Sequence, residues 1–313
     1  MTFASLSGRR VIVTGVSGFV GGSIANAWAH AGATVLGLCR SAARPPDIAA
    51  GVDVRVCTYA SADLVDTIAR FEPDVILHAA GSASVAASLA DPAADFASTV
   101  ALFQTLLEAT RRTRVRPLVI YPSSAAVYGN PDRLPVAETA ALHPVSPYGH
   151  HKMMAEALGR EYAVCFGVPV LAVRFFSIFG PRQKRLLLWE LFRRFVDEPS
   201  VTVRGSGNEV RDFLHIEDVA ASLASMLGRL AGPYATVNLA SGRGTSVADM
   251  ARLVGRHLGS TKDIVFGNRA QPSDPDRWIA DIAVAAGLGA GIPPNGSYDL
   301  EARVAATLRA WTS

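Results

Sequence analysis

The feature that most constrains the fold is a glycine-rich turn near the N-terminus, set between a predicted strand and a predicted helix. Residues 11–13 form a β-branched run, Val-Ile-Val, which predicts a buried strand. The sequence T-G-V-S-G-F-V-G follows at residues 14–21, and residues 23–32 have the amphipathic pattern of a helix that ends at glycine. This strand–turn–helix order is typical of a site where phosphate groups bind at a helix N-terminus.

The three glycines of this turn have separate physical roles. Gly15 permits the tight turn, Gly18 lets the backbone approach a pyrophosphate, and Gly21 lets the helix pack closely against the strand. Free N–H groups and the positive end of the helix dipole then face the phosphates. The residues expected to line a dinucleotide in this turn are Gly15, Ser17, Gly18, Phe19, Val20 and Gly21.

Strand and helix patterns alternate along the first half of the chain. The strand-like runs lie at residues 34–38, 52–57, 75–78, 118–121 and 168–174. The helical patterns between them include residues 63–71, 94–112 and 148–166. Such alternation predicts an α/β fold, a Rossmann-type doubly wound parallel sheet with helices on both faces.

After residue 174 the alternation weakens, and glycine and proline become more frequent. We expect residues 1–174 to form a dinucleotide-binding Rossmann domain, to which later segments at about 211–240 return. Residues 175–313 are expected to form mainly a smaller, irregular C-terminal lobe that binds the substrate.

Ligands of parallel sheets bind beyond the carboxyl ends of the strands, so the residues that follow each strand are candidates for a site. Ser123 and Ser124 end a central strand, where Ser124 can bond a substrate oxygen and Ser123 lies near a nicotinamide. A serine pair can equally make local turn hydrogen bonds. The other candidates at strand ends are Arg40, Ala79, Ala80, Gly81 and Phe175 for the cofactor, and Ser84 and Ser177 for the substrate.

Tyr148 and Lys152 are four residues apart in a predicted helix and therefore share one face of it. A positive charge beside a phenol favours the phenolate and lowers the pKa of the tyrosine from its ordinary value of about 10. A tyrosine tuned in this way can exchange a proton with an alcohol or a ketone. On its own the pair is a weak signal, because surface helices often carry tyrosine and lysine at this spacing.

Composition limits the classes of partner. With 313 residues, 50% of them hydrophobic, the chain can bury a large core, and its net charge of +3 is small. The arginines at 111–116 are best explained as a solvated helix end, so we expect no nucleic-acid partner. The three cysteines, Cys39, Cys57 and Cys165, are too scattered for a disulfide framework or a metal site. No signal peptide or membrane-length apolar run is present, and we expect a cytoplasmic protein without a membrane partner.

Six motifs in order resemble those of the extended short-chain dehydrogenases/reductases of the nucleotide-sugar epimerase and dehydratase superfamily, which includes UDP-glucose 4-epimerases. They are T-G-x-x-G-x-x-G at 14–21, H-A-A-G at 78–81, S-S-A-A-V-Y-G at 123–129, S-P-Y-G-H-H-K at 146–152, R-F-F-S-I-F-G-P-R-Q at 174–183 and R-D-F-L-H-I-x-D-V at 211–219. The resemblance covers nearly the whole chain.

The resemblance implies a role for each matching residue. Tyr148 would be the acid/base, Lys152 would hold the nicotinamide ribose, and Ser124 would bind the reacting sugar oxygen. Arg211 would meet the diphosphate of the substrate, since a guanidinium binds phosphate oxygens in pairs, and Arg277 is a second candidate for that contact. The implied partner is a nucleotide-diphosphate sugar.

The chain departs from the family at the cofactor site. Cys39 stands where NAD-dependent members usually have an aspartate that holds the ribose hydroxyls, and Arg40 follows directly. The electrostatics favour NADP over NAD, although Arg40 could instead stack on adenine. Thr58 and Tyr59 occupy the place of another family aspartate, at the end of the third strand.

Other departures bear on the reaction. Ala125 and Ala126 replace the Asp-Glu pair of 4,6-dehydratases and supply no proton donor or acceptor, which argues against a dehydratase. Ser177 and Thr99 stand where many relatives have asparagine, which leaves the sugar open.

Two enzymatic readings and one from another class remain open. We expect an epimerase acting at C4 through a transient 4-keto sugar; the alternative is an NADPH-dependent 4-keto nucleotide-sugar reductase. The third reading is a non-catalytic cofactor-sensing protein on the same fold. The resemblance also implies a homodimer that pairs through residues 94–112 and 148–166 in a four-helix bundle.

Overall fold

The computed structural model describes residues 6–40, 45–267, 275–292 and 298–312. Its centre is a seven-stranded sheet in the order β10-β6-β5-β4-β1-β2-β3, in which all neighbouring strands are parallel. The strands are β1 (Arg10–Thr14), β2 (Thr34–Cys39), β3 (Val52–Val56), β4 (Val75–His78), β5 (Leu118–Ser124), β6 (Val170–Phe175) and β10 (Tyr234–Leu239). The predicted Rossmann-type α/β fold is confirmed.

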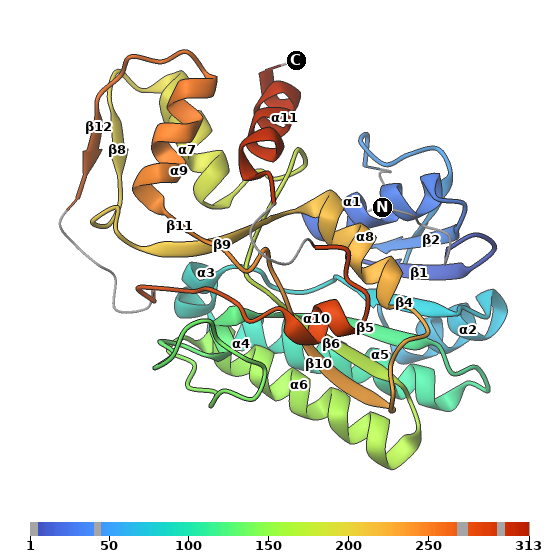
Figure 1. Cartoon of the computed structure of the whole chain (residues 1–313). Coiled ribbons are helices and arrows are strands. Elements are labelled where there is room, and N and C mark those ends of the chain that lie inside the picture. The colour runs from blue at the N-terminus through green and yellow to red at the C-terminus, as the bar shows by residue number, and fades with distance from the viewer. Residues whose placement is uncertain (1–5, 41–44, 268–274, 293–297, 313) are drawn as a thin grey trace.

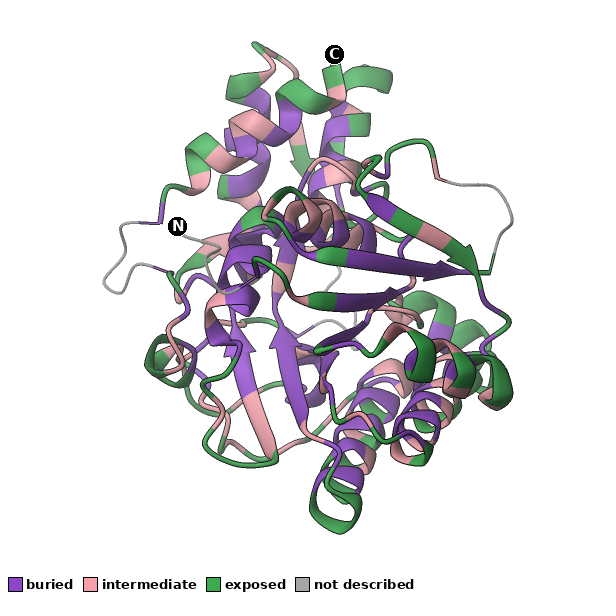
Figure 2. Cartoon of the chain, turned by 90° about the vertical axis from the view of Figure 1, so that its right-hand side faces the viewer, coloured by how far each residue is buried: buried purple, intermediate pink, exposed green. Residues whose placement is uncertain are grey.

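The strands form where the chain has apolar, β-branched runs, because a parallel sheet covered on both faces buries both sets of side chains. Residues of β4 and β6 are buried along the whole strand. Figure 2 shows the contrast, with buried strands in the centre and helices exposed on their outer sides.

Helices cover both faces of this sheet (Figure 1). One face carries α1 (Phe19–His30) and α8 (Ile216–Met226), which are joined by the Trp28 indole N–H donating to the Ala220 carbonyl at 2.9 Å. The other face carries α2 (Ser61–Phe71), α5 (Leu102–Arg112) and α6 (Pro147–Phe166). After β6 the chain leaves the central sheet, and it returns to it only with α8 and β10.

Most elements after β6 form two small sheets and a cluster of helices, seen at the upper left and upper centre of Figure 1, while the short helix α10 (Ala283–Gly287) packs against β10. One sheet has the order β11-β9-β7, with β7 (Ser177–Phe179), β9 (Val210–His215) and β11 (Gly244–Ser246). The other pairs β8 (Val201–Val203) with β12 (Ile264–Phe266). The helices α7 (Leu186–Asp197), α9 (Val247–His257) and α11 (Leu300–Thr312) pack around Phe179 and Phe213 in a core of their own. The division into two lobes at residue 174 stays a prediction.

The helix predicted over 94–112 is confirmed, and it begins two residues earlier. The structure is helical without a break through α4 (Pro92–Phe96), a π-helical turn η1 (Ala97–Ala101) and α5, and a short helix α3 (Val85–Ala90) precedes it. Asp91 caps α4 by accepting from the Ala94 N–H at 2.9 Å. A π-turn places one extra residue in the helix and re-aims the side chains around it, and its centre is the buried Thr99.

Among the described residues no helix is both long and apolar enough to cross a membrane. The cytoplasmic location stays a prediction.

Candidate active site

The N-terminal end of α6 is fixed by its own sequence. The Ser146 hydroxyl accepts from the Gly149 N–H at 3.2 Å, and Pro147 occupies the first turn, where its missing N–H has no cost. A Cβ added to Gly149 would lie 2.6 Å from the Ala126 carbonyl oxygen. Only glycine therefore lets α6 approach the turn η2 (Ala125–Val127) that follows β5 so closely.

This approach brings together the three predicted catalytic residues. The Tyr148 and Ser124 hydroxyls are hydrogen-bonded, and the Ser124 hydroxyl also accepts from the Ala126 N–H at 3.1 Å. The Lys152 ammonium donates to the Pro122 carbonyl at 2.8 Å and lies 5.6 Å from the centre of the Tyr148 ring. Tyr148 and Lys152 are thus on one helix face, as predicted, and both are turned to the end of β5.

The predicted lowering of the Tyr148 pKa is wrong. Burial around its hydroxyl raises the pKa of Tyr148 to about 12, and the hydrogen bond with Ser124 opposes this only in part. Burial also lowers the pKa of Lys152 to about 8, against the pull of the carboxylates of Asp95 and Glu156, which raise it. The spacing gave the right partners, but it carried no information on the loss of hydration, which is the larger effect.

Ser123 lies beside Ser124 but faces the protein interior. Its hydroxyl donates to Glu156 at 2.5 Å, and Arg174 of β6 donates to the same carboxylate through Nε at 3.0 Å and Nη2 at 2.6 Å. The guanidinium continues to the Tyr128 hydroxyl at 2.8 Å. Glu156 was missed in the sequence, although Tyr148, Lys152 and Glu156 follow one another at four-residue steps on one helix face.

The glycine turn has the close contacts expected of it. Gly15 has a φ of +67°, and a Cβ there would lie 2.6 Å from the Ala80 nitrogen. A Cβ on Gly21 would lie 2.5 Å from the Gly15 carbonyl oxygen. Helix α1 begins at Phe19, directly after Gly18, and no side chain caps its first N–H groups. Gly18, Phe19 and Val20 are therefore placed for a phosphate to take up these donors.

The second part of the predicted cofactor site lies beside this turn. Ala79, Ala80 and Gly81 follow β4, and the Ala80 N–H donates to the Thr14 hydroxyl at 3.1 Å. This bond joins the end of β4 to the end of β1, at the edge of the sheet where the cofactor is predicted to bind. Phe175 ends β6, where it is buried, and Ser17 lies in the turn itself.

Tyr59 was noted in the sequence only as a replacement of a family aspartate, and the structure gives it a contact of its own. Its hydroxyl donates to the Leu38 carbonyl at 3.0 Å and accepts from the Gly15 N–H at 3.1 Å. It therefore fastens the glycine turn to the end of β2. Thr58 donates to Asp63 at the start of α2, which leaves a carboxylate near the end of β3 in place of the family aspartate. Arg40 follows β2 and is exposed.

Arg182, from the loop after β7, reaches across to the same region. Its Nη1 lies 2.5 Å from Asp47 Oδ2 and donates to the Asp47 carbonyl at 2.8 Å. A Cβ on Gly22 would lie 2.5 Å from Nη2, so α1 needs glycine at this position to let the guanidinium pass. A segment that follows β6 is thereby linked to the first turn of α1 and to the loop after β2.

The predicted substrate residues lie on the elements around this end of the sheet. Arg211, on β9, donates to the Val210 and Asp276 carbonyls at 3.0 and 3.4 Å and lies 5.3 Å from the Trp278 ring. A β-bridge from Val210 to Arg277 puts the backbones of the two predicted phosphate-binding arginines side by side. Ser84 caps α3 by accepting from the Ala87 N–H at 3.1 Å, and Ser177 opens β7.

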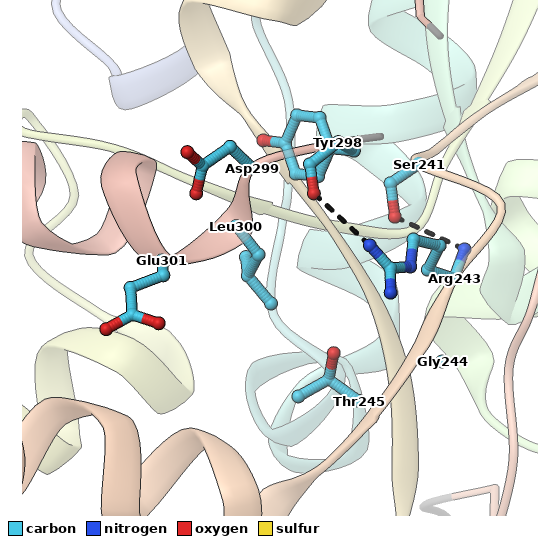
Figure 3. Close-up of a pocket in the computed structure, with 8 residues that line it drawn as sticks. All are labelled: Ser241, Arg243, Gly244, Thr245, Tyr298, Asp299, Leu300 and Glu301. Carbon is cyan, nitrogen blue, oxygen red and sulfur yellow. Dashed lines mark hydrogen bonds between the residues drawn. The ribbon is translucent and has the colours of Figure 1, made fainter. Parts of the chain in front are cut away.

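A cavity of about 270 Å³ lies elsewhere, between β11 and the start of α11 (Figure 3). Its lining residues are Ser241, Arg243, Gly244, Thr245, Tyr298, Asp299, Leu300 and Glu301. None of the predicted site residues is among them. Within the described ranges no cluster of three or more His, Cys, Asp or Glu side chains is arranged to hold a metal ion.

The comparisons with known proteins agree with this geometry. Residues 11–240 match the model of the NAD dependent epimerase/dehydratase family. The UDP-glucose 4-epimerase of Azospirillum brasilense is 29% identical over 301 residues, which cover 90% of this chain and 86% of that protein. A structure titled MoeE5 in complex with UDP-glucose and NAD is 26% identical and superposes with a TM-score of 0.85 over 96% of this chain and 98% of that one.

The fold is also shared by a UDP-N-acetylglucosamine 4-epimerase from Methanobrevibacter ruminantium, which is 22% identical with a TM-score of 0.88 over 98% of this chain and 99% of that one. The chain belongs to the NAD dependent epimerase/dehydratase family. The relative from Azospirillum brasilense is named as an epimerase of a nucleotide sugar, and the family is that of the extended short-chain dehydrogenases/reductases.

We predict that Gly21→Ala weakens binding of the dinucleotide at least about tenfold, or about 1.4 kcal/mol. The added methyl would meet the Gly15 carbonyl oxygen and push α1 away from β1, which moves the phosphate-binding N–H groups. Calorimetric titration with NAD, on protein freed of its nucleotide, measures the effect. Gly287→Ala is the matched control, because a Cβ there meets nothing within 4 Å; equal affinities of the two variants would contradict the prediction.

Proposed function

We propose that the protein is a nucleotide-diphosphate-sugar 4-epimerase that uses Tyr148, Lys152 and Ser124 to oxidise the sugar transiently at C4. The observation that carries the proposal is the meeting of these side chains at the end of β5. The glycine turn lies at the end of β1, two strands away from β5 at the same edge of the sheet, with β4 between them. A dinucleotide held by its diphosphate at α1 would reach from there toward Tyr148.

In this proposal the residues of the chain bind the sugar and move one proton. Ser124 and Tyr148 hold the C4 hydroxyl, and Tyr148 takes its proton as the C4 hydrogen leaves as hydride. A bound nicotinamide supplies the hydride acceptor and, in its oxidised form, a positive ring beside the phenol. Lys152 as an ammonium stabilises the phenolate. The 4-keto sugar then turns its opposite face to the nicotinamide. Tyr148 returns the proton to the C4 oxygen as the same hydride returns to that face of C4, and the opposite configuration results.

The relatives support a uridine diphosphate sugar as the substrate. The relative from Azospirillum brasilense is named UDP-glucose 4-epimerase, and the MoeE5 structure is a complex with UDP-glucose. In this chain Arg211 and Arg277 would bind the diphosphate, since their backbones are neighbours on the substrate side of the cofactor region. Ser84 and Ser177 would contact the sugar.

The second candidate is an NADPH-dependent 4-keto nucleotide-sugar reductase, in which Tyr148 gives a proton once and the cofactor leaves. Arg40 is the observation that favours it, because a cation at the end of β2 suits a 2′-phosphate. The link from Arg182 to Asp47 favours the epimerase instead, because it ties the loop after β2 to the substrate side and would slow cofactor release. The non-catalytic reading has no such support, since the hydrogen-bonded Tyr148–Ser124 pair is intact.

We propose NAD as the resident cofactor, whereas Cys39 and Arg40 led us to expect NADP from the sequence. The family description names NAD, and the similar structure holds NAD. In this chain the Asp63 carboxylate lies close behind the end of β3, where it accepts from the Thr58 hydroxyl and has no cation paired with it among the residues that the structure describes, and it would repel a 2′-phosphate.

We further propose a homodimer that pairs through a bundle of two helical segments from each chain, α4–α5 and α6. These segments expose large apolar side chains: Phe96 is 42% exposed, Met154 45% and Val164 69%. Burial of such side chains against a second copy would remove apolar surface from water.

The purified protein is predicted to carry NAD at close to one per chain and to interconvert UDP-glucose and UDP-galactose without added reductant. Tyr148→Phe is expected to lose this conversion by at least about a hundredfold, the lower range for a general acid–base, while keeping its NAD. Tyr234→Phe, a partly buried tyrosine on β10, is the control. No interconversion of the two sugars, together with reduction of a 4-keto nucleotide sugar at the cost of one NADPH per sugar, would favour the reductase.

For the cofactor we predict tighter binding of NAD than of NADP, measured by calorimetry on protein freed of its nucleotide. Arg40→Ala is expected to leave the affinity for NAD unchanged, because Arg40 is exposed and the NAD ribose carries no phosphate. Tighter binding of NADP than of NAD, lost in the Arg40→Ala variant, would contradict this prediction. It would show that Arg40 binds the 2′-phosphate.

In sedimentation velocity we predict a particle of twice the 33.0 kDa chain mass. The double variant Phe96→Lys, Met154→Lys is expected to sediment as a monomer, because two charges per chain would be buried in the pairing face. Val196→Lys, at an exposed position of α7, is the control. A monomeric unmodified protein rules out the dimer.

A further inference from the structure

A second buried acid–base pair lies directly behind the Tyr148–Lys152 pair. His151 Nδ1 is 2.6 Å from Asp95 Oδ2, and the two side chains are only 11% and 2% exposed. Asp95 belongs to α4 and His151 to α6, so the contact joins the two helices across their packing interface. The proposed reaction does not use this pair.

The pair is enclosed on the side away from the sheet. The Phe96 ring meets the His151 ring edge-on, with centroids 5.4 Å apart. On the α3 side, Ser88 is fully buried and its hydroxyl accepts from the Tyr148 N–H at 3.0 Å. Solvent water therefore does not reach the Asp95 carboxylate. Its electrostatic effect on neighbouring groups is screened less than it would be in water.

His151 satisfies only one of the two carboxylate oxygens. Asp95 Oδ1 is buried and has no hydrogen-bond partner, and the same holds for Thr99 Oγ1 in the following π-turn and for the Tyr121 hydroxyl on β5. A buried carboxylate oxygen without a donor is costly, so the negative charge of Asp95 must be balanced by a nearby cation.

The ionisable groups near Asp95 lie on two elements. Helix α6 supplies His151, Tyr148 and Lys152, with Glu156 one turn further along, and strand β5 supplies Tyr121. His78 of β4 lies near Lys152. Neither α3 nor η1 carries an ionisable side chain. The cation closest to this group is Lys152, whose Nζ lies 4.9 Å from the Tyr121 ring.

We propose that Asp95 is a positioning residue that controls the charges of the active site from behind: its carboxylate keeps Lys152 an ammonium and keeps the proton on Tyr148, and His151 holds the carboxylate in place. The proposal rests on the proposed function for its catalytic meaning. Its direction agrees with the electrostatics, since the charge of Asp95 raises the pKa of Lys152 and also that of Tyr148. The carboxylate thus keeps Lys152 protonated, and the phenolate of Tyr148 needs this positive charge. It also keeps Tyr148 protonated until the cofactor and the sugar are bound.

Asp95→Asn removes the charge with little change of shape, and we expect the Tyr148 phenolate to form at lower pH in this variant than in the unmodified protein. The measurement is the ¹³C NMR shift of Cζ-labelled tyrosine in protein saturated with NAD, followed over the pH range in which circular dichroism shows a folded chain. Tyr148→Phe identifies the resonance. We also expect the loss of kcat/KM at high pH, where Lys152 loses its proton, to begin at lower pH.

Asp91→Asn is the matched control, because it removes the same charge from the same short helix while an asparagine still caps it. His151→Asn keeps a donor near the position of Nδ1 and is expected to retain the titration curve of the unmodified protein. The proposal is overturned if the titration curve of the Tyr148 resonance in Asp95→Asn equals that of the unmodified protein over the whole folded pH range. It is also overturned if Asp91→Asn shifts this curve as much as Asp95→Asn does.

If Asp95→Asn does not fold, His151→Leu carries the test. This variant leaves the carboxylate without its donor, so we expect the onset of the Tyr148 phenolate to move to higher pH, and a curve unchanged or moved to lower pH overturns the proposal. The titration contains no sugar. A shifted Tyr148 curve in a protein that converts no UDP-sugar would therefore count against the proposed function and leave the role of Asp95 standing.

Discussion

The arrangement of the site depends on one buried ion pair, between Glu156 of α6 and Arg174 of β6. The guanidinium meets both carboxylate oxygens, at 3.0 and 2.6 Å, and the side chains are only 6% and 4% exposed. Such a pair adds little net stability compared with an apolar packing, but removal of one partner typically costs about 3–5 kcal/mol. It therefore fixes the register of α6 against the sheet. Because Ser123 donates to the same carboxylate, the strand that carries Ser124 is fixed by the same contact.

Helix register then determines what the site can do. One turn before Glu156, Lys152 is held at the Pro122 carbonyl, and one turn earlier Tyr148 reaches Ser124. Burial pushes the tyrosine pKa up to about 12 and the lysine pKa down to about 8, so burial alone favours the neutral forms of both groups. The phenolate becomes accessible only when positive charge collects beside it, which ties proton transfer to the bound cofactor and to the ammonium.

The sequence predicted those parts of the sheet and of the active site that depend on residues close together in the chain. The glycine turn, the parallel strands and the Tyr148–Lys152 face follow from local spacing, and each is found in the structure. Contacts between distant segments were not predictable in this way. The Arg182–Asp47 link joins residues 135 positions apart, and the Asp95–His151 contact joins residues 56 apart. Likewise, burial decides the direction of the Tyr148 pKa shift, and the π-turn inside the helix over 94–112 leaves no mark in the hydrophobic pattern.

The most direct test of the central claim is the fate of the hydrogen at C4. We would incubate the purified protein with UDP-glucose deuterated at C4 and examine the UDP-galactose formed by NMR and mass spectrometry. We predict that the deuterium is retained at C4 with inverted configuration, because a hydride taken up by a cofactor that stays bound returns to the same carbon. Product that has lost the deuterium, or no product unless a reduced cofactor is added, would contradict the claim.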